Sequence, residues 1–378
     1  MFSEKISDFL KITVNKLGNG AFGSVYVAEK ADNNKKIALK VEDKEKLDSL
    51  TLRNEFLMLR KISLLKKYIL CKDGNEKKNL EKNDNIIIYK YISENNLLVI
   101  PNNYSMNNMI VNKCIPDIHN YIETTDYNYL TMDLCGENLE NIIEKYSLTE
   151  NSKYFIAHKL LFTMFCVHSC GIIHRDIKLS NFVLSNILDT VNLNNTNNKK
   201  LFPMLIDFGL SKEFYKIENS KVIQSQFGKS KSITGTLRYI SISIHEHNTP
   251  TIIDDLISLC YCLCVIFTNK SLPWVGHKKD PDIFDSNNHT ESNCKCGYHK
   301  NRTNNNLKNN TIAEIKYHTP IEELITDNDG NKYIFLGKWL NYLYGLNKKA
   351  IPSYSVLYKY IKREKDENNL NFEIKNKK

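Results

Sequence analysis

The chain of 378 residues has no apolar run long enough to cross a bilayer. Its longest apolar stretch, 256–268, is too short for a transmembrane helix and fits a buried helix of a folded core. The first residues, MFSEK, carry no apolar signal-peptide core, so we expect neither secretion nor membrane insertion. Three of the ten cysteines, Cys260, Cys262 and Cys264, alternate along that apolar stretch, where they are not placed to pair with each other. We therefore expect reduced thiols in a soluble protein of the cytoplasm or the nucleus.

Acidic residues are fewer than basic ones: 43 Asp and Glu face 52 Lys and Arg, which gives a formal net charge of +9. The lysines are interspersed with asparagines, a pattern more typical of a solvated face than of a nucleic-acid-binding arm. We expect no nucleic-acid partner, no membrane partner and a monomer. The length suits two lobes, and a hydrophobic content of 42% is ample to bury their cores.

What the chain does contain is a run HRDIKLSN followed by a later DFG. Transfer of a phosphoryl group from ATP needs a carboxylate that orients the attacking hydroxyl and a cation near the γ-phosphate. Asp176 and Lys178 would supply these two groups. The same reaction needs a carboxylate and an amide that hold Mg²⁺, and Asp207 and Asn181 would supply them. This set and its order are typical of protein kinases.

A glycine-rich run, GNGAFGSV, lies upstream between two apolar segments and has the form G-x-G-x-x-G-x-V. Its glycines allow a hairpin backbone to approach phosphates without an intervening Cβ. The residues expected to contact the nucleotide here are Leu17, Gly18, Asn19, Gly20, Ala21, Phe22, Gly23, Ser24 and Val25. Next, IALKV reads as a strand whose cation, Lys40, would reach the α- and β-phosphates. Glu55, in a predicted helix over 52–62, is the expected ion-pair partner of Lys40. Each element alone is commonplace, but five of them in this order predict a kinase fold.

The segment after DFG reads GTLRYISISIH and lacks the Pro-Glu with which most protein kinases close it. It resembles the casein kinase 1 family, whose segment reads G-T-x-R-Y-x-S-I-N-x-H, with only the Asn changed, to Ser243. The similarity continues through IPDI, MDLCGENLE, DDL, SLPW and TPIEEL, and covers nearly the whole chain apart from three inserts. The related vaccinia-related kinases are the nearest rival, but they usually carry Gly where Arg175 stands.

The resemblance implies an α+β, bilobal protein kinase fold. A small antiparallel β lobe plus one helix is expected at 1–132, a larger mainly helical lobe at 133–362, and a basic, polar tail at 363–378. The implied activity is that of a Ser/Thr protein kinase that uses ATP and Mg²⁺ on acidic or phospho-primed protein substrates. Lys178, two places after the catalytic Asp, favours Ser or Thr as the acceptor, and dual specificity stays open. The alternative from another class is a nucleotide-binding pseudokinase that acts as a scaffold through its inserts.

Further roles follow from the resemblance position by position. Met132 is the expected gatekeeper behind the adenine, and the backbone of Asp133 and of Cys135 would hydrogen-bond its edge. Asp255 is expected to hold the backbone of the catalytic loop from the helix below. Thr236 is expected to bridge the catalytic carboxylate and the lysine two places after it.

Two anion pockets are also implied, each with members from segments far apart in the sequence. The pocket beside the activation segment joins Arg175, Lys212 and Lys231. The pocket near the acceptor groove joins Arg238, Gly276 and Lys308.

Three inserts depart from the family, at about 66–112, 187–200 and 279–306. Their low hydrophobicity predicts passive surface loops or disorder, with one strand-like stretch at 85–92. The third insert contains CKCGYH, which offers half of a zinc site, although C-x-C is too close for the common knuckle. The residues of that alternative are Cys294, Cys296 and His299.

Overall fold

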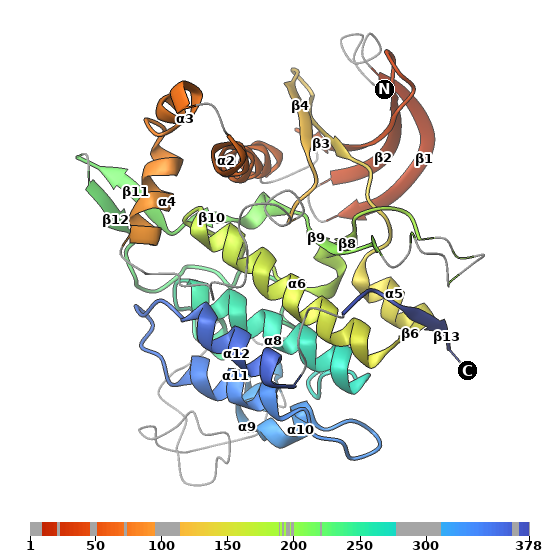
Figure 1. Ribbon diagram of the computed structural model, residues 1–378, viewed down its shortest axis with the longest axis vertical. Coiled ribbons are helices and arrows are strands. Elements are labelled where there is room, and N and C mark those ends of the chain that lie inside the picture. The colour runs from red at the N-terminus through yellow and green to blue at the C-terminus, as the bar shows by residue number, and fades with distance from the viewer. Residues whose placement is uncertain are drawn as a thin grey trace.

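The structure is a computed structural model, and the residues it describes are 10–20, 23–45, 51–71, 74–94, 114–188, 190, 193, 197, 200–219, 221–276, 311–364 and 370–377. They form two lobes, as the sequence predicts. A twisted sheet with helices beside it lies above a mainly helical lobe, and the chain passes between the lobes after β5 (Figure 1).

The first lobe is built on a five-stranded antiparallel sheet in the order β1-β2-β3-β5-β4. Its strands are β1 (Leu10–Gly20), β2 (Gly23–Lys30), β3 (Lys36–Asp43), β4 (Ile118–Glu123) and β5 (Tyr127–Asp133). The central strand β3 is buried on both faces: Ala38 packs into the large core and Leu39 into a smaller cluster on the other side. Its register places Lys40 opposite Val25 of β2 and Leu130 of β5. The sheet therefore fixes the predicted phosphate-binding cation at its centre.

Helix α2 (Leu52–Leu70) lies beside this sheet and is longer than the sequence predicts. Its first turn is held by Glu42, whose Oε1 accepts the backbone N–H groups of Thr51 and Leu52 at 2.5 and 2.9 Å. A carboxylate at this position satisfies free N–H groups at the helix N-terminus and complements its dipole. Glu42 is itself fully buried and also accepts from Asn128 Nδ2 at 2.9 Å. This contact fixes where α2 begins relative to β3.

The first insert is not a loop in its described part, and the predicted strand at 85–92 is wrong. Two helices form there, α3 (Gly74–Leu80) and α4 (Asp84–Glu94). Ile86 and Ile88 are buried whereas Ile87 is 38% exposed. Such a short apolar run is ambiguous between strand and helix, and the packing of α4 between α2 and the second lobe decides for the helix. The described part of the first lobe thus carries two helices more than the one expected.

The second lobe is organised around two buried helices, α6 (Glu150–Ser169) and α8 (Ile252–Thr268). The other helices in the described part of this lobe are α5 (Leu139–Lys145), α7 (Ile242–His245), α9 (Ile312–His318), α10 (Ile321–Ile325), α11 (Ile334–Tyr344) and α12 (Tyr354–Glu364). Short strand pairs complete it: β6 (Tyr146–Leu148) with β13 (Ile374–Asn376), β7 (Ile172–Ile173) with β10 (Lys212–Glu213), β8 (Phe182–Leu184) with β9 (Pro203–Leu205), and β11 (Tyr215–Glu218) with β12 (Lys221–Gln224). The buried helix expected at 256–268 is α8, and its three cysteines are buried free thiols. Across the described ranges no helix is both long and apolar enough to cross a membrane.

The described part of the expected polar tail, 370–377, packs back onto the second lobe. β13 pairs with β6, and Phe372 is fully buried. Ser152 of α6 secures this return, because its hydroxyl accepts from Glu373 N–H at 2.6 Å and contacts the Glu373 carbonyl at 2.5 Å. The chain end shown in Figure 1 accordingly lies beside α5 and β6.

Candidate active site

The expected ion pair between Lys40 and Glu55 is present at the boundary of the two lobes. Lys40 Nζ lies 2.5 Å from Glu55 Oε2 and 2.8 Å from Asp207 Oδ1. Burial by itself lowers the pKa of Lys40, but attraction to Glu55 and Asp207 outweighs burial and raises it. Burial likewise opposes ionisation of Asp207, but Lys40 holds the pKa of that carboxyl below its usual range. Lys40 and Asp207 are therefore both charged at neutral pH.

Asp207 adopts a left-handed backbone conformation, with φ of 68°, before the short 3₁₀ turn Phe208–Leu210. The side chain of Asn54 on α2 holds this strained turn. Its Nδ2 donates to the carbonyls of Gly209 at 3.0 Å and Ser211 at 2.9 Å, and contacts that of Phe208 at 3.4 Å. Asn54, the residue before Glu55 on α2, thus fixes the turn that carries Asp207. The sequence analysis missed this role of Asn54, since a lone Asn in a helix gives no signal.

The catalytic loop brings together the other predicted groups. Thr236 Oγ1 donates to Asp176 Oδ1 at 2.7 Å, and Lys178 Nζ lies 2.8 Å from Asp176 Oδ2. Lys178 Nζ also donates to Thr236 Oγ1 at 3.3 Å, so the expected bridge by Thr236 is present. Asn181 Nδ2 donates to the Asp176 carbonyl at 2.9 Å. Both oxygens of Asp176 are thus oriented by neighbours.

Asp255 of α8 holds the loop from below, as expected from the resemblance. Its carboxylate accepts the backbone N–H groups of His174 at 2.6 Å and of Arg175 at 2.9 Å. His168 Nε2 lies 3.0 Å from the same carboxylate, and Tyr354 OH contacts His168 Nδ1. These hydrogen bonds place the pKa of Asp255 below its usual range despite complete burial.

Asn181 and Asp207 are the two residues that would hold Mg²⁺. The side-chain amide nitrogen of Asn181 donates to Asp176, so the side-chain oxygen of Asn181 points away from Asp176 and is left as an acceptor. Asp207 adds a carboxylate. Within the described part of the chain no three His, Cys, Asp or Glu side chains cluster as a metal cage. A site with one carboxylate and one amide fits Mg²⁺, which is usually held by one or two carboxylates together with substrate phosphates.

The glycine-rich hairpin is described only in part. Gly23 has φ of +136°, and a Cβ built on it would lie 2.2 Å from the Val41 carbonyl oxygen, so only glycine fits. A Cβ on Gly18 would meet no atom within 4 Å, which leaves the space above this turn open. Ala21 and Phe22, and the side chain of Asn19, lie outside the described residues, and Gly20 is described only as the end of β1.

The connection between the lobes carries the residues expected at the adenine. Met132 is buried at the end of β5. The Asp133 N–H donates to the Asp117 carbonyl at 2.9 Å, and the Asp133 side chain pairs with Lys35 at 3.0 Å. The Asp133 carbonyl faces the Cys135 thiol at 3.7 Å. Burial raises the pKa of Cys135 to about 12, so its thiol is uncharged at neutral pH.

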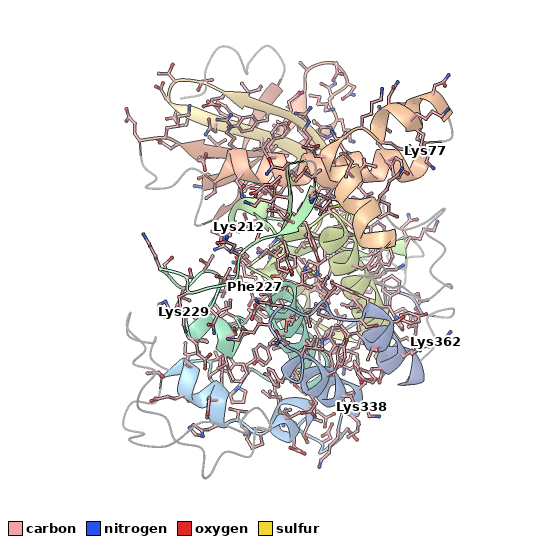
Figure 2. The ribbon with its side chains drawn as sticks, turned by 90° about the vertical axis from the view of Figure 1, so that its left-hand side faces the viewer. Lys77, Lys212, Phe227, Lys229, Lys338 and Lys362 are labelled. Atoms are coloured by element: carbon pink, nitrogen blue, oxygen red, sulfur yellow. The ribbon has the colours of Figure 1, made fainter. Side chains whose placement is uncertain are left out.

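The cations of the first expected anion pocket come from the catalytic loop and the activation segment. Arg175 has φ of 72°, and its guanidinium donates to Thr234 Oγ1 at 2.9 Å. Lys212 is exposed on β10 opposite Ile173, and Figure 2 shows it where the two lobes meet. Lys231 is also exposed.

The second expected pocket is described for two of its three members, because Lys308 lies outside the described residues. Arg238 Nη1 is paired with Glu140 Oε1 of α5 at 2.9 Å. The Arg238 carbonyl accepts from Trp274 Nε1 at 2.7 Å, two residues before Gly276. One indole thus ties the segments of both described members together. The contact with Glu140 was not foreseen from the sequence.

Buried Lys316 of α9 is a further contact that the sequence did not reveal. Its Nζ donates to the carbonyls of Leu237 at 2.5 Å and of Ile240 at 2.7 Å, and lies 3.2 Å from His245 Nε2. The ammonium therefore holds the backbone on both sides of Arg238. A single Lys in a Lys-rich chain gives no signal of such a role.

The alternative zinc residues Cys294, Cys296 and His299 lie outside the described residues, so that alternative stays a prediction.

Comparison with known proteins agrees with this geometry. Residues 87–327 match the family profile described as "Protein kinase domain". The chain is 30% identical over 266 residues, 69% of its length, to a Dictyostelium discoideum protein named "Probable serine/threonine-protein kinase". The match spans 41% of that relative, so the chain covers less than half of it. The profile match begins at residue 87 and so does not include Lys40 and Glu55. These two residues are placed in the site by the contacts described above.

Proposed function

Because the chain belongs to the protein kinase family, we propose that it is an active serine/threonine protein kinase of the casein kinase 1 type. The observation that carries activity is the complete set of charge contacts around Lys40 and Asp176. A scaffold that had lost catalysis would not need Asp176 oriented by both Thr236 and Lys178. The location in the cytoplasm or nucleus and the monomeric state stay predictions from the sequence.

In the proposed reaction, Asp176 accepts a hydrogen bond from the acceptor hydroxyl and aligns its oxygen with the γ-phosphorus. Lys178, already 2.8 Å from Asp176, places a positive charge beside the transferred group. Lys40 binds the α- and β-phosphates while Glu55 holds its ammonium in place. Asn181 and Asp207 would hold Mg²⁺, whose charge offsets that of the phosphates.

The proposed substrates carry Ser or Thr with an acidic or phosphorylated residue about three positions upstream. Arg238 supports this, because a guanidinium binds phosphate through charge-assisted hydrogen bonds and its backbone is held by Trp274. The casein kinase 1 assignment itself rests on GTLRYISISIH and on the absence of Pro-Glu from that segment.

A radioactive ATP assay with casein as the acceptor tests the proposal. Wild-type protein should transfer label from γ-labelled ATP to serine and threonine, and Asp176→Asn protein should not. ATP binding without transfer by the wild type would favour the scaffold alternative instead.

A further inference from the structure

Helix α4 fills the angle between α2 and the second lobe. Below the first half of α2 lies a cavity of about 480 Å³. Asn54 and Met58 of α2 form one wall, and Phe214 and Phe227 contribute to the other. The first half of α2 therefore meets the turn 208–210 through Asn54, whereas the cavity separates it from Phe214 and Phe227. Figure 1 shows α4 beside α2 on one side and reaching the β11–β12 hairpin on the other.

On the second-lobe side, α4 makes a close-packed apolar contact. Ile88 lies against Gly171, two residues after the end of α6, and a Cβ built on Gly171 would be only 2.9 Å from Ile88 Cγ2. Gly171 also has φ of +71°, so glycine is required there twice over. Ile86 and Ile88 are 0% and 4% exposed, and α4 contacts α6, β11 and β12. The insert is thus part of the main core and not an appendage.

On the other side, α4 and the turn before it hold the second half of α2. The Tyr89 ring meets the Tyr68 ring edge-on, with the ring centroids 6.3 Å apart. The Tyr68 hydroxyl donates to Glu81 Oε1 at 3.1 Å, and Lys90 of α4 pairs with the same oxygen at 3.0 Å. An ion pair from Lys61 of α2 to Glu213 of β10 lies nearby. The second half of α2 is therefore fixed by both polar and aromatic contacts.

We infer that α4 is a built-in brace that holds α2 against the second lobe and so keeps Glu55 on Lys40. Because α2 is one continuous helix of 19 residues, fixing its second half constrains the first half, which carries Asn54 and Glu55. Ile86 and Ile88 are positioning residues for the Lys40–Glu55 ion pair. This chain needs no separate protein to hold α2. The insert is therefore not passive, contrary to the prediction from the sequence. The inference rests on the proposed kinase activity, because the brace would regulate that activity.

Two isoleucines of the same helix provide a matched test. Ile88→Ala removes the contact with Gly171, whereas Ile87→Ala alters an exposed neighbour. Both are assayed below the temperature at which circular dichroism shows the onset of unfolding. The readouts are kcat/KM on casein, the Kd for ATP, and hydrogen exchange over 52–62 and 208–210. We expect Ile88→Ala to lower kcat/KM about tenfold or more, because the competent position of α2 becomes less populated, and to speed exchange in both segments. Ile87→Ala should match the wild type in all three.

Two outcomes separate the brace from simple stabilisation. If Ile88→Ala lowers the melting temperature but leaves kcat/KM and the exchange of 52–62 at wild-type values, the inference is overturned. If Ile88→Ala does not fold, Glu81→Gln replaces it, because this partly exposed residue links Tyr68 to Lys90 and its change spares the core. Glu81→Gln should then raise exchange in 52–62 and lower kcat/KM several-fold, and no change in either would also overturn the inference. Wild-type protein that transfers no phosphate would refute the proposed function, while the exchange data would still decide on the brace.

Discussion

Arg238 and Glu140 form an ion pair at the proposed acceptor side of the site, with Nη1 and Oε1 2.9 Å apart. The two side chains are 42% and 30% exposed. An exposed pair of this kind contributes only about 1 kcal/mol or less, so a doubly charged phosphate can displace the carboxylate. In the free protein, Glu140 thus occupies the cation that we propose for substrate recognition.

Peptides with phosphoserine, Asp or Ala three positions before the acceptor test this recognition. The phosphorylated peptide should give a kcat/KM at least about tenfold above the Ala peptide, equivalent to roughly 1.4 kcal/mol. Arg238→Ala should remove that lead, because the charge-assisted donors to the phosphate are gone. Glu140→Gln serves as the control: it frees Arg238 and should preserve or increase the lead. Equal rates on all three peptides with wild type would refute the pocket and leave a kinase without this preference.

Loss of the catalytic groups should separate turnover from folding. Asp176→Asn and Lys40→Met should each lower kcat by orders of magnitude, because they remove groups that position or stabilise the transition state. Asp176→Asn should unfold close to the wild-type temperature, whereas Lys40→Met should stay folded but melt at a lower temperature, because it leaves the carboxylates of Glu55 and Asp207 without their cation. Asp207→Asn should in addition weaken Mg²⁺-dependent ATP binding, measured by calorimetry with and without Mg²⁺. Retention of more than about a tenth of wild-type turnover by Asp176→Asn would contradict its assigned role.

Activity should not require phosphorylation of the activation segment. Arg175 already donates to the unmodified hydroxyl of Thr234 at 2.9 Å, and α2 is held by contacts within the chain. Protein made in bacteria and treated with phosphatase should therefore phosphorylate casein, with mass spectrometry confirming that no phosphate remains. Deletion of 191–199 should leave that rate unchanged. A rate that appears only after the segment is phosphorylated would count against the anion pocket at Arg175.

The sequence predicts well those parts of the site that lie in short, ordered motifs. HRDIKLSN and DFG fix Asp176, Asn181 and Asp207, because the chemistry of phosphoryl transfer permits few alternatives at these positions. The Lys40–Glu55 pair was predictable for the same reason. The two-lobed fold follows from the order of these motifs.

Contacts made by isolated residues were not predictable, because they depend on tertiary packing. Glu140 ends the segment MDLCGENLE but has no role there that the sequence reveals, and Lys316 belongs to no motif. Their partners lie 98 and between 71 and 79 positions away. The helix α4 was misread because three consecutive isoleucines suit a strand as well as a helix with two packed sides. Low hydrophobicity of the first insert as a whole concealed the few residues that enter the core.

Lys316 offers a test of how the acceptor segment is held. It is 4% exposed, its ammonium donates to Leu237 and Ile240, and it also lies 5.2 Å from the centre of the Trp274 ring. Lys316→Met keeps most of the side-chain volume but leaves two carbonyls without this donor, at a cost of about 1–3 kcal/mol for each buried unsatisfied group.

We expect Lys316→Met to raise the KM for a casein-derived peptide several-fold, because the backbone on both sides of Arg238 is released. The KM for ATP and the slow hydrolysis of ATP by water should stay at wild-type values, since Lys40, Asp207 and Asn181 are untouched. Lys338→Met, an exposed change on α11 that is visible in Figure 2, is the matched control and should leave all three quantities unchanged. If ATP hydrolysis by Lys316→Met fell together with peptide phosphorylation, Lys316 would support the whole lobe and not the acceptor segment in particular.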